Sequence, residues 1–313
     1  MSTYDVIVVG AGAGGGVAAG VLAEAGKAVL LIERGREMAF EDVPRDHLRN
    51  HRYSRYGHNT GPSLEGNPRV LVDLDGHEHT LRPHEDAYQN NATGVGGGAR
   101  VYGAQAWRYL PADFEMASTY GVPAGSSLAD WPIGYADVAP YYERAEWEIG
   151  VCGDSVGSAE RWPRDRDYPM PPVQLNRQGA LMRRGAEALG WSTLAVPLLI
   201  NSTPYGGRPA CIHCQHCIGF ACPVDAKNDS QNTLLARGRA TGRVEVVTEA
   251  MVEQVNTVGG RVVGVTYVDR DDKRQSARAE VVAAHRAHKP ERPNRTMTVI
   301  GGRLTAAAEQ LVE

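Results

Sequence analysis

The sequence has no long apolar run, no excess of basic residues and few cysteines. A membrane-spanning helix needs about 20 consecutive apolar residues, and the longest hydrophobic stretches are much shorter, so we expect no membrane span. The formal net charge of −4 lacks the strongly basic character that is typical of nucleic-acid-binding proteins. Five cysteines are too few for a disulfide scaffold. These absences indicate a globular protein whose partner is a small molecule.

The amino end leaves little room for an export signal. A predicted strand begins at Tyr4, almost directly after Met1, whereas a signal peptide needs a basic region followed by an apolar one. We therefore expect a cytoplasmic protein. With 313 residues, the chain is long enough for one large or two ordinary domains with a sizeable core.

The stretch from Tyr4 to Gly35 has the pattern of a nucleotide-binding unit. A β-branched run predicts a buried strand, a run of small apolar residues predicts a helix that ends at Gly26, and a second apolar run predicts another strand. These elements lie at residues 4–9, 17–25 and 28–32. A glycine-rich turn separates the first strand from the helix, as in dinucleotide-binding proteins.

Each glycine in that turn has a separate role. Gly10 permits the tight turn, Gly12 lets the backbone approach a pyrophosphate, and Gly15 lets the helix pack on the strand. Glu33 ends the second strand, where it can accept hydrogen bonds from an adenosine ribose, and its charge argues that Arg34 does not bind a 2′-phosphate. A glycine-rich turn alone is common in ordinary loops, but the flanking elements favour dinucleotide binding. The motif does not separate FAD from NAD.

A second glycine-rich turn lies at residues 94–98 and precedes a predicted helix at residues 99–107. Glycine at this density indicates backbone held close to a ligand's phosphates or flat ring, although a flexible loop is the alternative. Its candidate cofactor-contacting residues are Gly94, Gly96, Gly97 and Ala99. Two such turns suit a long dinucleotide that runs through the protein.

Aromatic and acidic residues continue this pattern in a fixed order, at residues 130–135, 140–142 and 146–150. Together with both glycine turns, this ordered set resembles the glucose-methanol-choline (GMC) family of FAD-dependent oxidoreductases over roughly the first 280 residues. The resemblance implies that FAD is the cofactor, with Gly94–Ala99 near its pyrophosphate and flavin ring and the backbone of Val252 at its adenine. It also implies oxidation of a CH–OH group in a sugar, polyol or sterol by hydride transfer to the flavin.

The resemblance implies an α/β fold: a Rossmann-like three-layer FAD/NAD(P)-binding domain with a partial substrate or cap domain. The predicted regions are the first part of the FAD-binding domain at 1–110, the cap at 111–204, a cysteine-rich loop with the return to the FAD-binding domain at 205–284, and an atypical tail at 285–313. Within the return, a helix at 232–240, a hairpin through Gly259 and Gly260 and a strand at 279–284 are expected.

Four of the five cysteines lie close together in the sequence, at Cys211, Cys214, Cys217 and Cys222. The spacing resembles that of a ferredoxin cluster, with one extra residue before the last cysteine. Thiolates at such spacing can hold an iron–sulfur cluster or a tetrahedral zinc ion, whereas cysteines that only pack are usually scattered. A flavin nearby favours the cluster, because electrons from a reduced flavin need a carrier. A cysteine-rich segment of this kind also resembles the gluconate- and glucoside-dehydrogenase branch of the family.

Two other motifs carry no functional prediction. Residues 153–157 fit G-x-S-x-G, the nucleophile elbow of serine hydrolases, but a polar stretch broken by proline follows them, so we interpret the match as chance in a loop. Six of the ten histidines lie between His47 and His84. His77 and His79 share one face of a predicted strand, yet no third ligand follows at a regular interval, and we interpret these histidines as loop residues.

No stretch of the chain resembles the family's catalytic histidine segment, so we assign no catalytic residue. Residues 285–313 also do not resemble the family. An alternative to an active oxidoreductase is therefore a truncated flavin-binding remnant, or one half of a split enzyme that a partner subunit completes. Its partial cap would leave apolar surface exposed. A nicotinamide-linked flavoprotein would need a second nucleotide-binding turn after a strand, and no strand is predicted before Gly94.

Overall fold

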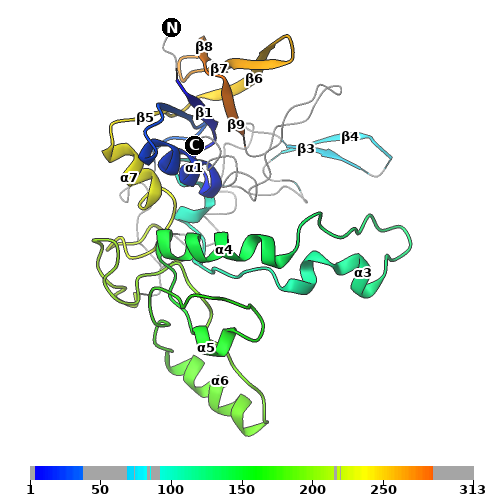
Figure 1. Ribbon diagram of the computed structural model, residues 1–313, viewed down its shortest axis with the longest axis vertical. Coiled ribbons are helices and arrows are strands. Elements are labelled where there is room, and N and C mark those ends of the chain that lie inside the picture. The colour runs from blue at the N-terminus through cyan, green and yellow to red at the C-terminus, as the bar shows by residue number, and fades with distance from the viewer. Residues whose placement is uncertain are drawn as a thin grey trace.

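The structure is a computed structural model that describes residues 4–37, 69–73, 75–82, 85, 92–214, 217–218 and 220–284. The predicted tail at 285–313 lies outside these residues. Figure 1 shows an elongated molecule, with strands β1, β5–β9 and helices α1 and α7 at one end and helix α6 at the other.

A four-stranded parallel sheet lies at the centre of the first part. The strand order is β5-β2-β1-β9, with bounds Val244–Val247, Val29–Ile32, Val6–Val9 and Val281–Ala284. Val6 pairs with Val29 on one side and with Val281 on the other. Because β1 lies between strands from opposite ends of the described chain, the sheet is completed only when the chain returns to it.

Both faces of this sheet are covered, which explains the continuous apolar runs of β1 and β2. Val8 and Leu31 pack on one face, with residues of helices α1 (Ala13–Glu24) and α7 (Leu234–Ala240). Ile7 and Leu30 pack on the other face, with residues of a three-stranded antiparallel sheet. The expected three-layer α/β architecture is therefore observed.

The antiparallel sheet consists of β6 (Met251–Val258), β7 (Arg261–Val268) and β8 (Arg274–Arg278). Gly259 and Gly260 connect β6 to β7 with φ angles of 56° and 78°. Positive φ at both central residues is what a two-residue hairpin turn needs, and the structure confirms the predicted hairpin.

Helices α1 and α7 pack through glycine. A Cβ atom on Gly20 would lie 2.3 Å from the carbonyl oxygen of Leu234, and one on Gly238 would lie 2.8 Å from the Cα atom of Gly20. Helix α1 begins earlier than predicted, because the last residues of the glycine turn are already helical. It ends as predicted before Gly26, whose φ of 87° stops the helix.

The predicted cap region contains short helices and loops. Its elements are η3 (Pro111–Phe114), α3 (Met116–Tyr120), α4 (Tyr135–Ala145), the π-helical turn η4 (Glu146–Gly150), α5 (Ser155–Ser158) and α6 (Arg177–Ala188). No residue of α6 is buried, and Met182 is 75% exposed. A hairpin of β3 (Arg69–Val72) and β4 (Glu78–Leu81) projects from another side (Figure 1).

The predicted helix at residues 99–107 is wrong. Only a short 3₁₀ turn, η2 (Gly97–Arg100), forms there. The backbone that follows instead joins the segment 197–199: Leu199 N–H donates to the carbonyl of Ala104 at 2.7 Å, and Ala106 N–H donates to that of Pro197 at 2.9 Å. Pairing with another segment uses the backbone N–H and carbonyl groups that a helix would need for its own hydrogen bonds.

The helices in the described ranges are each too short or too polar to cross a bilayer.

The close contact between α1 and α7 predicts a strong effect of one added methyl group. Gly20→Ala is expected to lower the free energy of unfolding by about 2–3 kcal/mol, because the new Cβ would meet the backbone of Leu234. Urea unfolding followed by circular dichroism measures the change. Gly185→Ala is the control, because a Cβ there meets nothing within 4 Å and lies in the exposed helix α6. A free energy of unfolding for Gly20→Ala within about 0.5 kcal/mol of the wild-type value would contradict this packing.

Candidate functional site

The first glycine turn joins β1 to α1 and has one closed and one open side. Gly10 has a φ of 90°, and a Cβ atom on Gly15 would lie only 1.8 Å from the carbonyl oxygen of Gly10. Side chains at these positions are therefore excluded. In contrast, Cβ atoms on Gly12 and Gly14 would meet no atom within 4 Å. The open side lies at the amino end of α1, where free N–H groups and the helix dipole favour phosphate.

The second glycine turn lies directly against the first. Gly96 N–H donates to the carbonyl of Ala11 at 2.8 Å, and a Cβ atom on Gly97 would lie 3.2 Å from the Cα atom of Gly12. Gly98 has open space beside it. The structure thus brings together the two turns that the sequence analysis assigned to one ligand.

Gly94 and Ala99 lie on either side of that contact. Gly94 is buried against Gly35, since a Cβ atom on Gly35 would lie 2.4 Å from the amide nitrogen of Gly94. Ala99 lies within η2 and is half-buried. The end of β2 therefore supports the second turn as well as the first.

Glu33 joins these parts through its carboxylate. Its side chain is buried, and its two oxygens accept from Ala11 N–H at 2.7 Å and from Gly35 N–H at 2.8 Å. A carboxylate has about four acceptor sites, so it can bind the turn and still accept from a ribose. Arg34 is exposed, and its guanidinium lies 3.5 Å from the hydroxyl of Thr93.

Val252 lies near the start of β6 in the antiparallel sheet, two residues after Ala250. The segment before it is bonded to the end of β2, because Ala250 N–H donates to the carbonyl of Glu33 at 3.0 Å and Glu249 N–H donates to that of Gly35 at 2.9 Å. The expected adenine-contacting strand and the expected ribose-binding acid are therefore neighbours.

The four clustered cysteines surround one small cavity. Cys211, Cys214, Cys217 and Cys222 are free thiols and line a cavity of about 20 Å³ together with Lys227. Backbone N–H groups already point at two sulfurs, from His213 to Cys211 at 3.3 Å and from Ala226 to Cys222 at 3.2 Å. Burial raises the pKa of the Cys211 and Cys217 thiols, and the charge of Lys227 opposes that rise in the pKa of Cys217.

The cysteine sulfurs are spaced more widely than in a closed zinc site. A zinc–sulfur bond of about 2.3 Å places the sulfurs of a tetrahedral site about 3.8 Å apart. No three of the four sulfurs lie within 4.8 Å of one another; in the described ranges only Asp73, Asp75 and His77 have ligand atoms that close together. The cysteine cavity thus leaves more room between its thiols than one metal ion needs.

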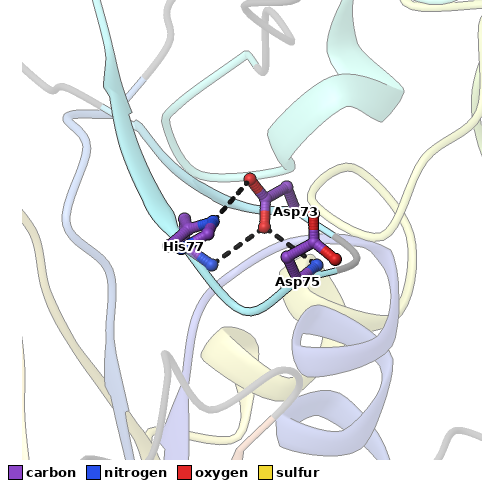
Figure 2. A group of neighbouring side chains, drawn as sticks. All are labelled: Asp73, Asp75 and His77. Atoms are coloured by element: carbon purple, nitrogen blue, oxygen red, sulfur yellow. Dashed lines mark hydrogen bonds and ion pairs between the residues drawn. The ribbon is translucent and has the colours of Figure 1, made fainter.

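The Asp73 cluster is accounted for by the hairpin turn between β3 and β4 (Figure 2). The Asp73 carboxylate accepts from the backbone N–H groups of Asp75 at 3.0 Å and His77 at 2.8 Å, and its other oxygen lies 2.8 Å from Nε2 of His79. The hydrogen bond with His79 holds the pKa of Asp73 below its usual value. These bonds stabilise the turn, as expected for loop residues. His47, His51, His58 and His84 lie outside the described residues.

A buried polar segment that the sequence analysis did not identify connects the cysteine cavity with the glycine turns. Lys227, Asn228, Asp229 and Ser230 are each at most 3% exposed. Asp229 forms a 2.9 Å ion pair with Arg100 of η2. The hydroxyl of Ser230 donates to the carbonyl of Gly12 at 3.1 Å. Residues 227–233 are seven consecutive polar residues, a pattern typical of the protein surface, so no signal in the sequence marked this segment as buried.

Lys227 is the charged residue of this segment that faces the cysteines. Its ammonium group donates to the carbonyls of Cys217 at 2.7 Å, Phe220 at 2.9 Å and Tyr102 at 3.2 Å. Burial lowers the pKa of Lys227 to about 8, although the nearby thiols and Asp229 oppose the shift. The lysine therefore joins the cysteine loop to the chain that follows the second glycine turn.

The aromatic and acidic series in the cap has a structural role. Arg108 forms two 2.7 Å bonds with the carboxylate of Glu146 and donates to the hydroxyl of Tyr135 at 3.0 Å. Trp162 donates to the carbonyl of Arg108 at 3.0 Å. Because both charged residues are buried, this network holds the cap together and is costly to break.

The G-x-S-x-G match lies where the sequence analysis expected, in a loop with a single helical turn. Ser155 begins the four-residue helix α5, and its hydroxyl accepts from Tyr168 N–H at 2.9 Å. A nucleophile elbow needs a strand before the serine, which is not the arrangement here.

Residues 4–291 match the GMC oxidoreductase family. The chain is 32% identical over 286 residues to paromamine 6'-oxidase of Streptomyces fradiae, a match that covers 90% of this chain and 47% of that protein. It is 30% identical over 301 residues to the fructose dehydrogenase large subunit of Gluconobacter japonicus, with 92% and 53% covered. The chain spans about half the length of the curated relatives it matches.

The predicted cysteine-rich branch is also represented among these relatives. Gluconate 2-dehydrogenase flavoprotein of Pantoea cypripedii is 25% identical over 319 residues, which covers 90% of this chain and 50% of that protein. Among solved structures, pyridoxine 4-oxidase from Mesorbium loti shares the fold, with a TM-score of 0.52 at 17% identity over 90% of this chain and 49% of that one. Since the family match runs through both glycine turns, the cysteine loop and the whole parallel sheet, the chain belongs to the GMC oxidoreductases, a family of FAD-binding proteins.

Proposed function

We propose that this chain binds FAD and belongs to an oxidoreductase that acts on the CH–OH group of a sugar, polyol or sterol alcohol. The observation that carries the proposal is the contact between the two glycine turns, with open space beside Gly12, Gly14 and Gly98. The two turns pack together without side chains between them, and their other side is open. Such an arrangement fits a diphosphate and the groups attached to it.

The residues of the chain fit the parts of FAD. The amino end of α1 at Gly12 and Gly14 would hold the diphosphate, Glu33 the adenosine ribose, and the backbone of Val252 the adenine. Gly94–Ala99 would lie near the diphosphate and the flavin. When bound, FAD supplies the acceptor for the hydride of the alcohol.

The names of the relatives support a polyhydroxylated substrate. Two of them are named for fructose and gluconate, which carry several CH–OH groups. Fructose dehydrogenase is named as a large subunit, so a partner subunit or another electron acceptor is part of the proposal.

Removal of the alcohol proton also needs a base. The histidines in the described ranges lie in the β3–β4 hairpin and in the cysteine loop, at His77, His79 and His213. We therefore assign the base to sequence that corresponds to the unmatched half of the relatives. The position of these histidines favours a second candidate function, a flavin-binding half that is inactive until a partner completes it.

The cysteine cavity is proposed to hold an iron–sulfur cluster, which would carry electrons away from the flavin. Four free thiols that line one cavity support the assignment. The wide spacing of the sulfurs favours a cluster over zinc, because a cluster places several metal and sulfide atoms between its thiolates.

Two glycine variants are expected to separate cofactor binding from folding. Gly12→Ala should keep the stability of the wild type, since its Cβ meets no atom and its φ of −71° suits alanine, but should weaken FAD binding by at least about tenfold, because the Cβ occupies the path of the diphosphate. Gly15→Ala should destabilise the protein by about 3 kcal/mol. Flavin absorbance after dialysis against FAD, together with thermal unfolding, measures both effects. Unchanged FAD affinity in a folded Gly12→Ala protein would count against the proposed site.

Cysteine variants are expected to remove metal without removing FAD. Cys217→Ala should lose iron and acid-labile sulfide, while Cys152→Ala should retain them, because Cys152 belongs to the apolar cluster against which Cys211 and Cys217 pack but does not itself line the cavity. Metal analysis of anaerobically purified protein provides the measurement. Stoichiometric zinc in the wild type, without sulfide, would replace the cluster assignment by a zinc site.

Anaerobic mixing with alcohols tests the activity. Fructose, gluconate and simpler polyols are expected to bleach the flavin bands if the chain is active alone, and a dye acceptor should then restore them. Flavin that stays oxidised with every compound, but is bleached by dithionite, would support the flavin-binding half. A folded protein that takes up no FAD would contradict both functions.

A further inference from the structure

We propose that Lys227 is the positioning residue of the cysteine site. Its ammonium group holds the cysteine loop, residues 211–222, against the segment at Tyr102 and provides a positive charge beside the four thiols. The charge part of this inference rests on the proposed metal site, and the positioning part rests on the chain alone.

The hydrogen bonds of Lys227 use the full capacity of its side chain. The three acceptors are the carbonyl oxygens of Cys217, Phe220 and Tyr102, at 2.7, 2.9 and 3.2 Å. An ammonium group has three donors and no acceptor, and a carbonyl only accepts. All three donors of the protonated form are therefore used, and the residue is only 3% exposed.

These bonds reach the middle of the loop. The backbone bonds at the two ends of the loop run from Cys211 N–H to the carbonyl of Asn201 at 2.7 Å and from Asp225 N–H to that of Cys222 at 3.4 Å. Two of the carbonyls that Lys227 binds lie between these ends, at Cys217 and Phe220. The lysine itself is anchored, because its backbone bridges to Ile200.

Among the residues that the structure describes, no carboxylate contacts the ammonium group of Lys227. All three bonded groups are neutral carbonyls, and Asp229 is paired with Arg100 instead, at 2.9 Å with the carboxylate fully buried. A buried charge without a counter-ion is costly. The anionic groups that face it across the cavity are the thiols of the cysteine site when they are ionised, as metal binding requires. Lys227 is thus placed to offset the negative charge of an occupied site.

Three substitutions separate the two roles. Lys227→Arg keeps the charge but changes the shape of the side chain. Lys227→Gln keeps hydrogen-bond donors but removes the charge. Lys227→Met keeps the length of the side chain and removes both the charge and the donors. Lys273→Met is the matched control, because the side chain of Lys273 is 70% exposed at the surface. Flavin binding and thermal unfolding verify that each variant is folded, and Lys227→Gln retains a test of the charge if Lys227→Met does not fold.

Hydrogen–deuterium exchange of the metal-free protein tests the positioning role. Amides of residues 211–222 should exchange at least about tenfold faster in Lys227→Met than in the wild type, since hydrogen bonds from a charged group are lost. Amides of β1 and β2 should be unaffected, and Lys273→Met should match the wild type throughout. Equal exchange of the loop in a folded Lys227→Met protein would overturn this role.

A redox titration of the metal-loaded protein tests the charge. Reduction adds negative charge to the site, so Lys227→Gln and Lys227→Met should have more negative midpoint potentials than the wild type, while Lys227→Arg should lie nearer to it. Equal potentials in all four proteins would overturn the charge role. A wild-type protein that binds no metal after reconstitution would instead refute the proposed metal site and with it the charge role, and the exchange experiment would still decide the positioning role.

Discussion

The rest of the site depends on how closely the backbone of α1 approaches the end of β1. A single Cβ atom on Gly15 would lie 1.8 Å from the carbonyl oxygen of Gly10, so the helix can start at this point only because no side chain intervenes. The N–H groups at its amino end then point to the open side of the turn. The second glycine turn and Glu33 both bond to Ala11, and therefore take their positions from this contact.

The buried segment from Lys227 to Ser230 gives the molecule its second constraint. Each of its charged and hydroxyl side chains bonds to a different part: Lys227 to the cysteine loop, Asp229 to η2 and Ser230 to the first glycine turn. Buried polar groups must find partners, and here the partners belong to all three parts of the candidate site. A single short stretch of chain thus determines where the glycine turns and the cysteine cavity lie relative to each other.

Motifs that identify a family do not all take part in chemistry. The aromatic and acidic residues of the cap are held by the network of Arg108, Glu146 and Tyr135, whose side chains bond to one another. Their order along the chain helped to indicate the family, but their contacts explain the packing of the cap. The glycine turns, in contrast, leave a side of the backbone open for a ligand.

Local patterns in the sequence were sufficient for the β1–α1–β2 unit and the Gly259–Gly260 hairpin, because glycine conformation and apolar periodicity act over a few residues. The helix expected at 99–107 was wrong, since pairing with residues 197–199 overrides local preference. The spacing of the four cysteines along the sequence was enough to predict that they lie around one site. Tertiary structure alone decided that Gly96 meets Ala11, that Glu33 supports the turn, and that Lys227 faces the thiols. Burial of a polar side chain depends on what packs over it, and the partners of Lys227 and Asp229 come from segments more than 100 residues away as well as from nearby ones.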